Sequence, residues 1–300
     1  MSDLRGTDLR IHCIGTIAMD TLSIDQEATI LGITSRGVFL QAAERRIVFL
    51  SFEEYHGPLT ANLSGDLQHL VNLSPGGAVT VRQERIAFAD SDISISTSEA
   101  IVWKPPEPTG PPLNAMNRTD RIRNLAIEVY QQKGTEGLGE MLPVLAGFSP
   151  TCVTRNNQFQ GLYASIDEIR GQIARGDLLP LSQTIQSFLG VGGGLTPSGD
   201  DFVVGLLLSL NRWESILEPG NLAVLGEQVV EAAHRCTTTL SASLIECAVL
   251  GLADERLIQA VDFLAAAEYQ QSEILPGLLN WGNSSGVDAL VGMITALSPT

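Results

Sequence analysis

The pattern of apolar and polar positions changes once along this chain, after about the first third. Over residues 9–103 apolar and polar side chains alternate, β-branched residues are frequent, and turns rich in Gly, Pro and Ser separate the short runs. Short strands at this spacing predict a mostly antiparallel sheet or a small barrel. From about residue 117 apolar positions recur every three or four residues, which predicts a series of α-helices.

A proline-rich segment separates the two patterns. Residues 105–112 read PPEPTGPP, a composition that favours a stiff, extended connection. We therefore predict a β-rich domain over 1–104, a linker over 105–116 and an all-helical domain over 117–300. Because strands precede helices instead of alternating with them, the predicted fold class is α+β, with a mostly antiparallel N-terminal β domain.

Two segments of the helical part are apolar on nearly every side, which predicts buried helices. The segments 198–210 and 285–297 both begin with Ser-Gly-x-Asp and carry a glycine four residues after the Asp, at Gly205 and Gly292. This spacing places each Asp and glycine on one helix face. We expect the two helices to cross closely at these glycines, with their N-termini pointing into one polar cleft.

The first of these helices follows an unusual glycine-rich run. Residues 190–201 read GVGGGLTPSGDD, with Ser198 as the expected N-cap and Asp201 three residues later. Capping accounts for these two residues but not for the triple glycine or for Asp200. The free N–H groups and the positive end of a helix dipole favour an anion at such a position.

Ordinary helix capping is an alternative explanation for part of this pattern. For residues 285–288 a structural and a functional role are equally supported, because Ser-x-x-Asp stabilises the start of any helix. Arg235 is equally consistent with an anion-binding guanidinium and with a charge pair at a helix end. His234 fits a helix-end residue better than a general base.

The charge balance narrows the possible partners. The net charge is −16, from 34 acidic and 18 basic residues, which argues against nucleic acid and anionic membranes as partners. Lysine occurs only as Lys104 and Lys133, and Leu195 stands where a phosphate-binding P-loop needs its lysine. Neither lysine lies near the motifs in the sequence, so no Schiff base is expected there. The four cysteines are scattered, and no signal peptide or membrane span is evident, which favours the cytoplasm.

Three segments together resemble a known family. The run GVGGGLTPSGDDF, the cluster of Thr237, Thr238 and Ser241, and the later GNSSGVD occur in the order typical of AllH-like proteins. That family is linked to a subunit of oxamate carbamoyltransferase in anaerobic allantoin breakdown. The resemblance covers most of the helical half and, more loosely, the β half. The family typically has a proline where Gly193 stands, which implies a more flexible loop here.

The resemblance implies a carbamoyl transfer in which oxalurate and phosphate exchange with oxamate and carbamoyl phosphate, within an assembly of different subunits. Such a reaction requires a cradle for an anion, stabilisation of an oxyanion and correct placement of the attacking group. Backbone N–H groups would hold phosphate or carboxylate, hydroxyls would bind the carbamoyl group, and a guanidinium would pair with a substrate carboxylate. The expected binding residues are Gly192, Gly193, Gly194, Thr196, Gly199, Arg235, Thr238, Ser285 and Gly286, and the expected catalytic residues are Ser198, Asp200, Asp201 and Asp288.

Two other functions stay open from the sequence. One is a non-catalytic assembly subunit whose glycine loop forms a site shared with a partner. The other is a Mg²⁺-dependent hydrolase that uses Asp200, Asp201 and Asp288, because carboxylates alone suit Mg²⁺ or Mn²⁺ rather than zinc. For Asp201 we favour accepting N–H groups of the substrate, whereas Asp200 is also a possible Mg²⁺ ligand. No cofactor is certain.

Overall fold

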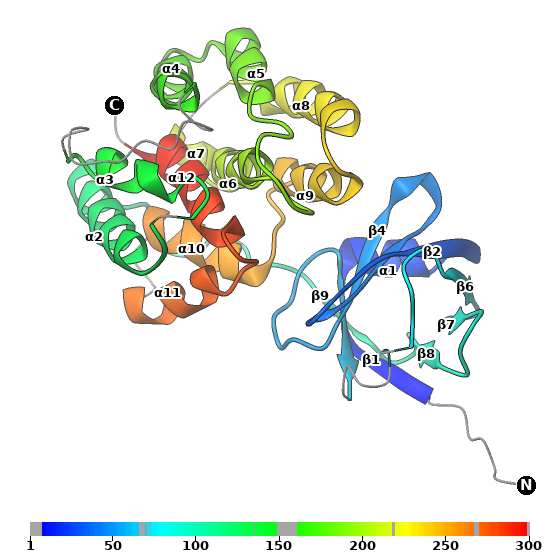
Figure 1. Ribbon diagram of the computed structural model, residues 1–300. Helices are drawn as coiled ribbons and strands as arrows, with labels where there is room; N and C mark the ends of the chain where they lie inside the picture. The colour runs from blue at the N-terminus through cyan, green and yellow to red at the C-terminus, as the bar shows by residue number, and fades with distance from the viewer. Residues whose placement is uncertain are drawn as a thin grey trace, which may run out of the picture. The chain divides into compact units, whose positions relative to one another are not determined.

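The computed structural model describes residues 8–65, 70, 72–134, 136–148, 161–217, 220–266 and 270–298. The chain divides into two compact units, residues 1–106 and 107–300 (Figure 1). No helix in the described ranges combines the length and the apolar character needed to cross a membrane.

The first unit is built from short strands with one helix and one 3₁₀ turn. The elements are β1 (Asp8–Gly15), α1 (Thr16–Leu22), β2 (Gln26–Thr34), β3 (Gly37–Gln41), η1 (Ala43–Arg45), β4 (Ile47–Ser51), β5 (Thr60–Ser64), β6 (Ala78–Arg82), β7 (Arg85–Phe88), β8 (Ser94–Ser96) and β9 (Ile101–Trp103). Among these, eight strands pair in the order β5-β4-β3-β2-β6-β7-β8-β1, and β1 also pairs with β5, which closes a barrel. Strand β9 extends from β1 outside this closed ring.

The barrel is mixed, so the prediction of a mostly antiparallel domain is wrong. Strand β1 runs parallel to β8 and to β9, and β4 runs parallel to β5. Hairpin neighbours such as β2–β3 and β6–β7 are antiparallel, as their short turns require. The parallel pairs join strands without a tight turn between them. Alternation of apolar residues shows which face of a strand is buried but not in which direction its partner runs.

The second unit is helical apart from an isolated β-bridge between Pro112 and Ala266. Its elements are α2 (Ala115–Lys133), η3 (Gly139–Met141), α3 (Leu142–Leu145), α4 (Leu162–Arg175), α5 (Leu178–Gln186), α6 (Ser198–Arg212), α7 (Glu214–Leu217), α8 (Leu222–Cys236), α9 (Thr239–Val249), α10 (Glu255–Ala265), α11 (Gln271–Leu279) and α12 (Ser285–Leu297). Helices α6 and α12 lie side by side in the middle (Figure 1). Helices α8 and α9 pack on α6, whereas α2, α3 and α11 pack on α12.

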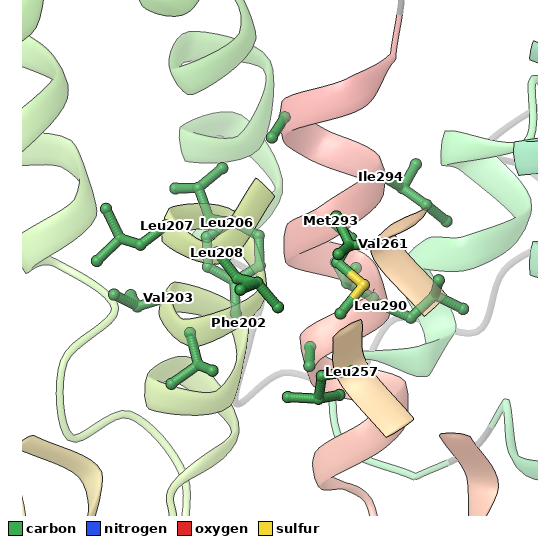
Figure 2. Packing of buried hydrophobic residues seen from close by; sticks show 14 of the residues in the cluster. Phe202, Val203, Leu206, Leu207, Leu208, Leu257, Val261, Leu290, Met293 and Ile294 are labelled. Carbon is green, nitrogen blue, oxygen red and sulfur yellow. The ribbon is translucent and has the colours of Figure 1, made fainter. Parts of the chain in front are cut away.

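The two central helices are buried because their apolar residues surround the whole helix axis. Residues 198–210 and 286–297 are buried throughout. Figure 2 shows side chains of α6, α10 and α12 in one cluster, among them Leu206, Val261 and Met293. Almost all stabilisation of this pair therefore comes from burial of apolar surface against neighbouring helices.

The two helices cross at the predicted glycines, which confirms this part of the expectation, whereas the polar cleft at their N-termini stays a prediction. A Cβ on Gly205 would lie 1.9 Å from the carbonyl oxygen of Ala289. Reciprocally, a Cβ on Gly292 would lie 2.0 Å from the carbonyl oxygen of Phe202. Only glycine allows the two backbones to approach this closely. Each glycine takes the same position in its own helix, so the contact is the same in both directions.

The segments that lead into the two helices also correspond. The amide of Gly199 donates to the carbonyl of Val191 at 2.8 Å, and the amide of Gly286 donates to the carbonyl of Trp281 at 2.9 Å. In both cases the preceding helix, α5 or α11, ends a few residues before this bond. The helical unit therefore contains two related hairpins that face each other across the α6–α12 crossing.

Candidate functional site

The start of α6 is covered by the chain that precedes it. Pro197, not Ser198, occupies the N-cap position and makes no side-chain cap, so the predicted serine cap is wrong. The amides of Asp200 and Asp201 reach the carbonyl of Pro197 at 2.9 and 3.1 Å. A Cβ on Gly192 would lie 2.7 Å from the backbone nitrogen of Ser198. The backbone itself thus occupies much of the space expected for an anion.

Asp200 connects three segments of the protein. One of its carboxylate oxygens accepts the amide of Gly190 at 2.8 Å, and the other accepts the hydroxyl of Thr237. The side chain is buried, and burial raises its pKa, while the bonds from Thr237, Gly190 and Ser241 act in the opposite direction. Because both oxygens are engaged within the protein, the contacts of Asp200 fit a structural role, holding the turn before α6 to the start of α9.

Asp201 and Asp288 occupy equivalent positions in the first turns of α6 and α12. Asp201 is 1% exposed and Asp288 is 0% exposed. Burial raises the pKa of Asp201 well above its usual range, and the nearby charge of Asp288 raises it further. Burial also raises the pKa of Asp288, to about 6, although the amide of Leu138 opposes this shift by donating to its carboxylate at 2.5 Å.

Each helix places its first serine beside the aspartate of the other helix. The Ser285 hydroxyl lowers the pKa of Asp201, and the Ser198 hydroxyl lowers the pKa of Asp288. The hydroxyls of Thr196 and Ser285 lie 3.2 Å apart. The predicted residues Thr196, Ser198, Asp201, Ser285 and Asp288 therefore come together at the two helix starts.

Three of the four carboxylate oxygens of Asp201 and Asp288 lack a hydrogen-bond donor among the described residues. Both oxygens of Asp201 and the Oδ2 atom of Asp288 are buried and have no hydrogen-bond partner among the described residues. The neighbouring hydroxyls are near enough to affect the pKa of Asp201, but none forms a hydrogen bond of normal geometry with it. Buried polar atoms are nearly always satisfied in native proteins, so these oxygens require an explanation.

The glycine-rich loop is more open than the helix start. Gly192 and Gly194 have φ of +118° and +96°, a region that favours glycine, whereas Gly193 does not need this freedom. Gly193, Gly194 and Leu195 are exposed, and the Thr238 hydroxyl donates to the carbonyl of Leu195 at 2.8 Å. Thr238 also caps α9 by accepting the amide of Ser241. The contacts of Thr238 are therefore with the loop and with its own helix.

Arg235 makes the charge pair that its helix-end position allowed. Its guanidinium pairs with Glu231 at 2.5 Å, one turn earlier in α8, and 60% of its side chain is exposed. His234 similarly contacts Glu246 of α9 at 2.5 Å. In the part of the chain that the structure describes, neither has a recorded contact with the two aspartates. Gly199 and Gly286 contact the backbone before their own helices, because a Cβ on either would lie within 2.0 Å of a carbonyl oxygen.

A further wall of the site comes from the end of α2, which sequence analysis missed. Gly137 has φ of +51°, and a Cβ there would lie 2.2 Å from Oδ1 of Asp288. Lys133 donates from Nζ to the carbonyl of Asn283 at 2.7 Å. The expectation that neither lysine lies near the motifs is therefore wrong in space. Leu138 precedes Asp288 by 150 residues in the sequence, so local spacing does not predict this contact. The one signal in the sequence is the glycines that follow the end of α2, such as Gly137, because a glycine after a helix allows another segment to approach closely.

Among the described residues, no group of three or more His, Cys, Asp or Glu side chains is placed to hold a metal ion. Asp200, Asp201 and Asp288 lie in the first turns of α6 and α12, but the oxygens of Asp200 already accept protein hydrogen bonds. The contacts of Asp200 thus leave little capacity for a Mg²⁺ ion.

The helical unit contains two reciprocal helices whose first turns bury Asp201 and Asp288, and three of the four carboxylate oxygens of this pair have no donor among the described residues. Residues 188–297 match the family model described as oxamate carbamoyltransferase subunit AllH. This segment spans α6 to α12 and includes the two aspartates, so the family resemblance is confirmed over this part of the chain. The segment is therefore similar to a subunit of an oxamate carbamoyltransferase. Neither a curated protein nor a solved structure matches the chain.

Proposed function

We propose that this protein is a subunit of a carbamoyltransferase acting on oxamate, and that the paired helix starts bind the substrate that bears the amide or carbamoyl group. The supporting observation is the burial of Asp201 with neither carboxylate oxygen hydrogen-bonded. Carboxylates accept hydrogen bonds only, and an amide or carbamoyl NH₂ offers two donors. A substrate of this class supplies what the buried oxygens lack.

The hydroxyls complete this binding arrangement. Thr196, Ser198 and Ser285 each carry one O–H donor that can reach a carbonyl oxygen of the same ligand. Positioned donors of this kind stabilise the oxyanion that develops when the carbamoyl carbon is attacked. In the phosphorolysis direction, a phosphate oxygen bonds to the carbamoyl carbon, the C–N bond to oxamate breaks, and the nitrogen takes up a proton. Asp288, whose pKa is raised to about 6, is the proposed relay: its carboxylate takes the proton that the phosphate loses and passes it to the leaving nitrogen.

The exposed Gly192–Gly194 loop is the proposed contact for the phosphate. Its backbone N–H groups are the proposed counterpart to the anion, because the amide of Gly199 is already bonded to Val191 and those of Asp200 and Asp201 are bonded to Pro197. Since the family is described as a subunit, other chains are expected to complete the enzyme.

Asp201→Asn in the reconstituted assembly tests this proposal. The exchange replaces one acceptor oxygen by a donor, so we expect the rate of carbamoyl transfer to fall about 10- to 100-fold, as for a lost hydrogen bond to a charged group. Asp167→Asn, at an exposed position of α4, is the matched control and should keep full activity. An Asp201→Asn assembly as active as the control would remove this carboxylate from substrate binding.

Thermal stabilisation by ligand separates a complete site from a shared one. Oxamate or carbamoyl phosphate should raise the Tm of the isolated chain if the site is formed by this subunit alone. A shift that appears only when partner subunits are present favours the second candidate, a non-catalytic subunit with an interfacial site. The exposure of the loop at Gly193 and Leu195 is the observation that favours that alternative.

A further inference from the structure

Lys133 lies beside the cluster of acidic side chains formed by Glu136, Asp201 and Asp288. Lys133 is the last residue of α2, and its ammonium donates to the carbonyl of Asn283 at 2.7 Å. Asn283 immediately precedes the Ser284–Ser285 pair that opens α12. The lysine side chain is 27% exposed, so its charge is held against the site while remaining in contact with solvent.

The same ammonium is linked to the buried aspartates through Glu136. Nζ of Lys133 lies 3.6 Å from Oε2 of Glu136, an ion pair without a hydrogen bond. Glu136 is close enough to Asp288 to raise the pKa of that carboxyl group. Among the described residues, Oε2 of Glu136, both oxygens of Asp201 and Oδ2 of Asp288 are buried carboxylate oxygens without a hydrogen-bond donor, and Lys133 lies beside Glu136.

We infer that Lys133 binds the oxyanion end of the substrate, while Asp201 and Asp288 accept its N–H groups. The inference rests on the proposed function. An ammonium group has three donors, and among the residues that the structure describes only the bond from Lys133 to Asn283 is of normal hydrogen-bond length. Without a cation, a site with this many carboxylates repels carboxylate and phosphate ligands. The other basic candidate, Arg235, is engaged with Glu231.

This arrangement predicts selectivity by charge. Oxamate carries an amide at one end and a carboxylate at the other, whereas oxamide has the same size and is neutral at both ends. Lys133 should favour oxamate over oxamide, because its ammonium forms a charge-assisted bond only with the anion. Inorganic phosphate is the second oxyanion that this ammonium can bind.

The experiment compares Lys133→Met with Lys104→Met in the reconstituted assembly, using calorimetric titration with oxamate, oxamide and phosphate. Lys104 is the other lysine of the chain and lies in the first unit, so it is the matched control. We expect Lys133→Met to weaken oxamate binding about tenfold, the effect of one charge-assisted hydrogen bond, and to leave oxamide binding unchanged. Lys133→Arg should restore part of the preference, because it keeps the charge.

The outcomes separate the inference from the proposed function. A loss confined to phosphate overturns the inference, because phosphate has no N–H groups for Asp201 and Asp288, and it assigns Lys133 to a separate phosphate site. Equal losses for oxamate and oxamide show that Lys133 only supports the fold, and unchanged affinities show that it binds no ligand; both overturn the inference while the proposed function stands. If the wild-type assembly binds none of the three ligands, both fall together.

Discussion

Replacing Asp288 by Asn should stabilise the helical unit at neutral pH and at the same time weaken substrate binding. Asp288 is fully buried, and only its Oδ1 atom has a hydrogen-bond donor, the amide of Leu138. Asparagine keeps an acceptor oxygen for that amide and removes the charge. It also presents an NH₂ group to the hydroxyl oxygens nearby, so no buried donor needs to be left unpaired.

The magnitude follows from the raised pKa of this carboxyl group. Burial raises the pKa of Asp288 from 3.8 to about 6. At about 1.4 kcal/mol per pH unit, keeping the carboxylate ionised in the folded state costs roughly 3 kcal/mol relative to the unfolded chain. Between about pH 4 and pH 6 the folded state retains a proton that the unfolded state has released, so stability falls as the pH rises. Above about pH 6 both states are ionised, and the cost stays constant.

The stability difference between Asp288→Asn and the wild type therefore depends on pH. The free energy of unfolding of Asp288→Asn, minus that of the wild type, should rise by about 2.5 kcal/mol from pH 4 to pH 7. Urea denaturation followed by tryptophan fluorescence measures this, because Trp213 and Trp281 belong to the helical unit. A difference that does not change with pH would show that the Asp288 charge is not destabilising.

A second buried aspartate provides a control of opposite sign. Asp262 accepts hydrogen bonds from the Arg212 guanidinium at 2.7 Å through both oxygens and from the Trp213 ring nitrogen at 3.0 Å. Asp262→Asn leaves the buried guanidinium without its counter-charge and should destabilise the protein by about 3–5 kcal/mol at neutral pH. Asp262→Asn and Asp288→Asn should therefore change the free energy of unfolding in opposite directions. The Asp262 carboxylate stabilises the protein, whereas the Asp288 carboxylate destabilises it.

Three further variants test the packing of the site. Gly205→Ala should lower the free energy of unfolding by at least about 1–3 kcal/mol, because its Cβ would lie 1.9 Å from a backbone oxygen of α12. A Cβ on Gly193 meets nothing within 4 Å, so Gly193→Ala should change the free energy of unfolding by less than about 0.5 kcal/mol. Urea denaturation measures both. Asp200→Ala should cost about 1–3 kcal/mol in the same assay, because the amide of Gly190 and the hydroxyl of Thr237 lose their acceptor. An Asp200→Ala protein as stable as the wild type would contradict its structural role.

The repeated Ser-Gly-x-Asp-x-x-x-Gly pattern was enough to predict the most important contact of the helical unit. A glycine in a helix that is apolar on all sides indicates that another backbone approaches the helix closely. When a chain has two such helices, each is the expected packing partner of the other. The same reasoning placed Ser198, Ser285 and the two equivalent aspartates near one another. These predictions succeeded because they depend on local spacing along a helix.

The predictions that failed depend on contacts between distant segments. The direction of β1 relative to β8 is set by how the barrel closes, which alternation within a strand does not encode. The approach of Lys133 to Asn283 joins positions 150 residues apart. The expected serine cap of α6 failed for a related reason, since the amide of Gly199 is bonded to the preceding turn at Val191.

The energy of the two buried aspartates argues that they are kept for function. A carboxylate in the first turn of a helix gains about 0.3–1 kcal/mol from the helix dipole, and up to about 2 kcal/mol in favourable partly buried geometry. The ionised Asp288 costs roughly 3 kcal/mol, to which the nearby charge of Glu136 contributes, and burial also disfavours the charged form of Asp201. The dipoles of α6 and α12 thus do not offset the burial of both groups. A ligand that donates N–H groups to the carboxylate oxygens of Asp201 and Asp288, with its anionic end at Lys133, would offset this free-energy cost. It would do so only while it is bound.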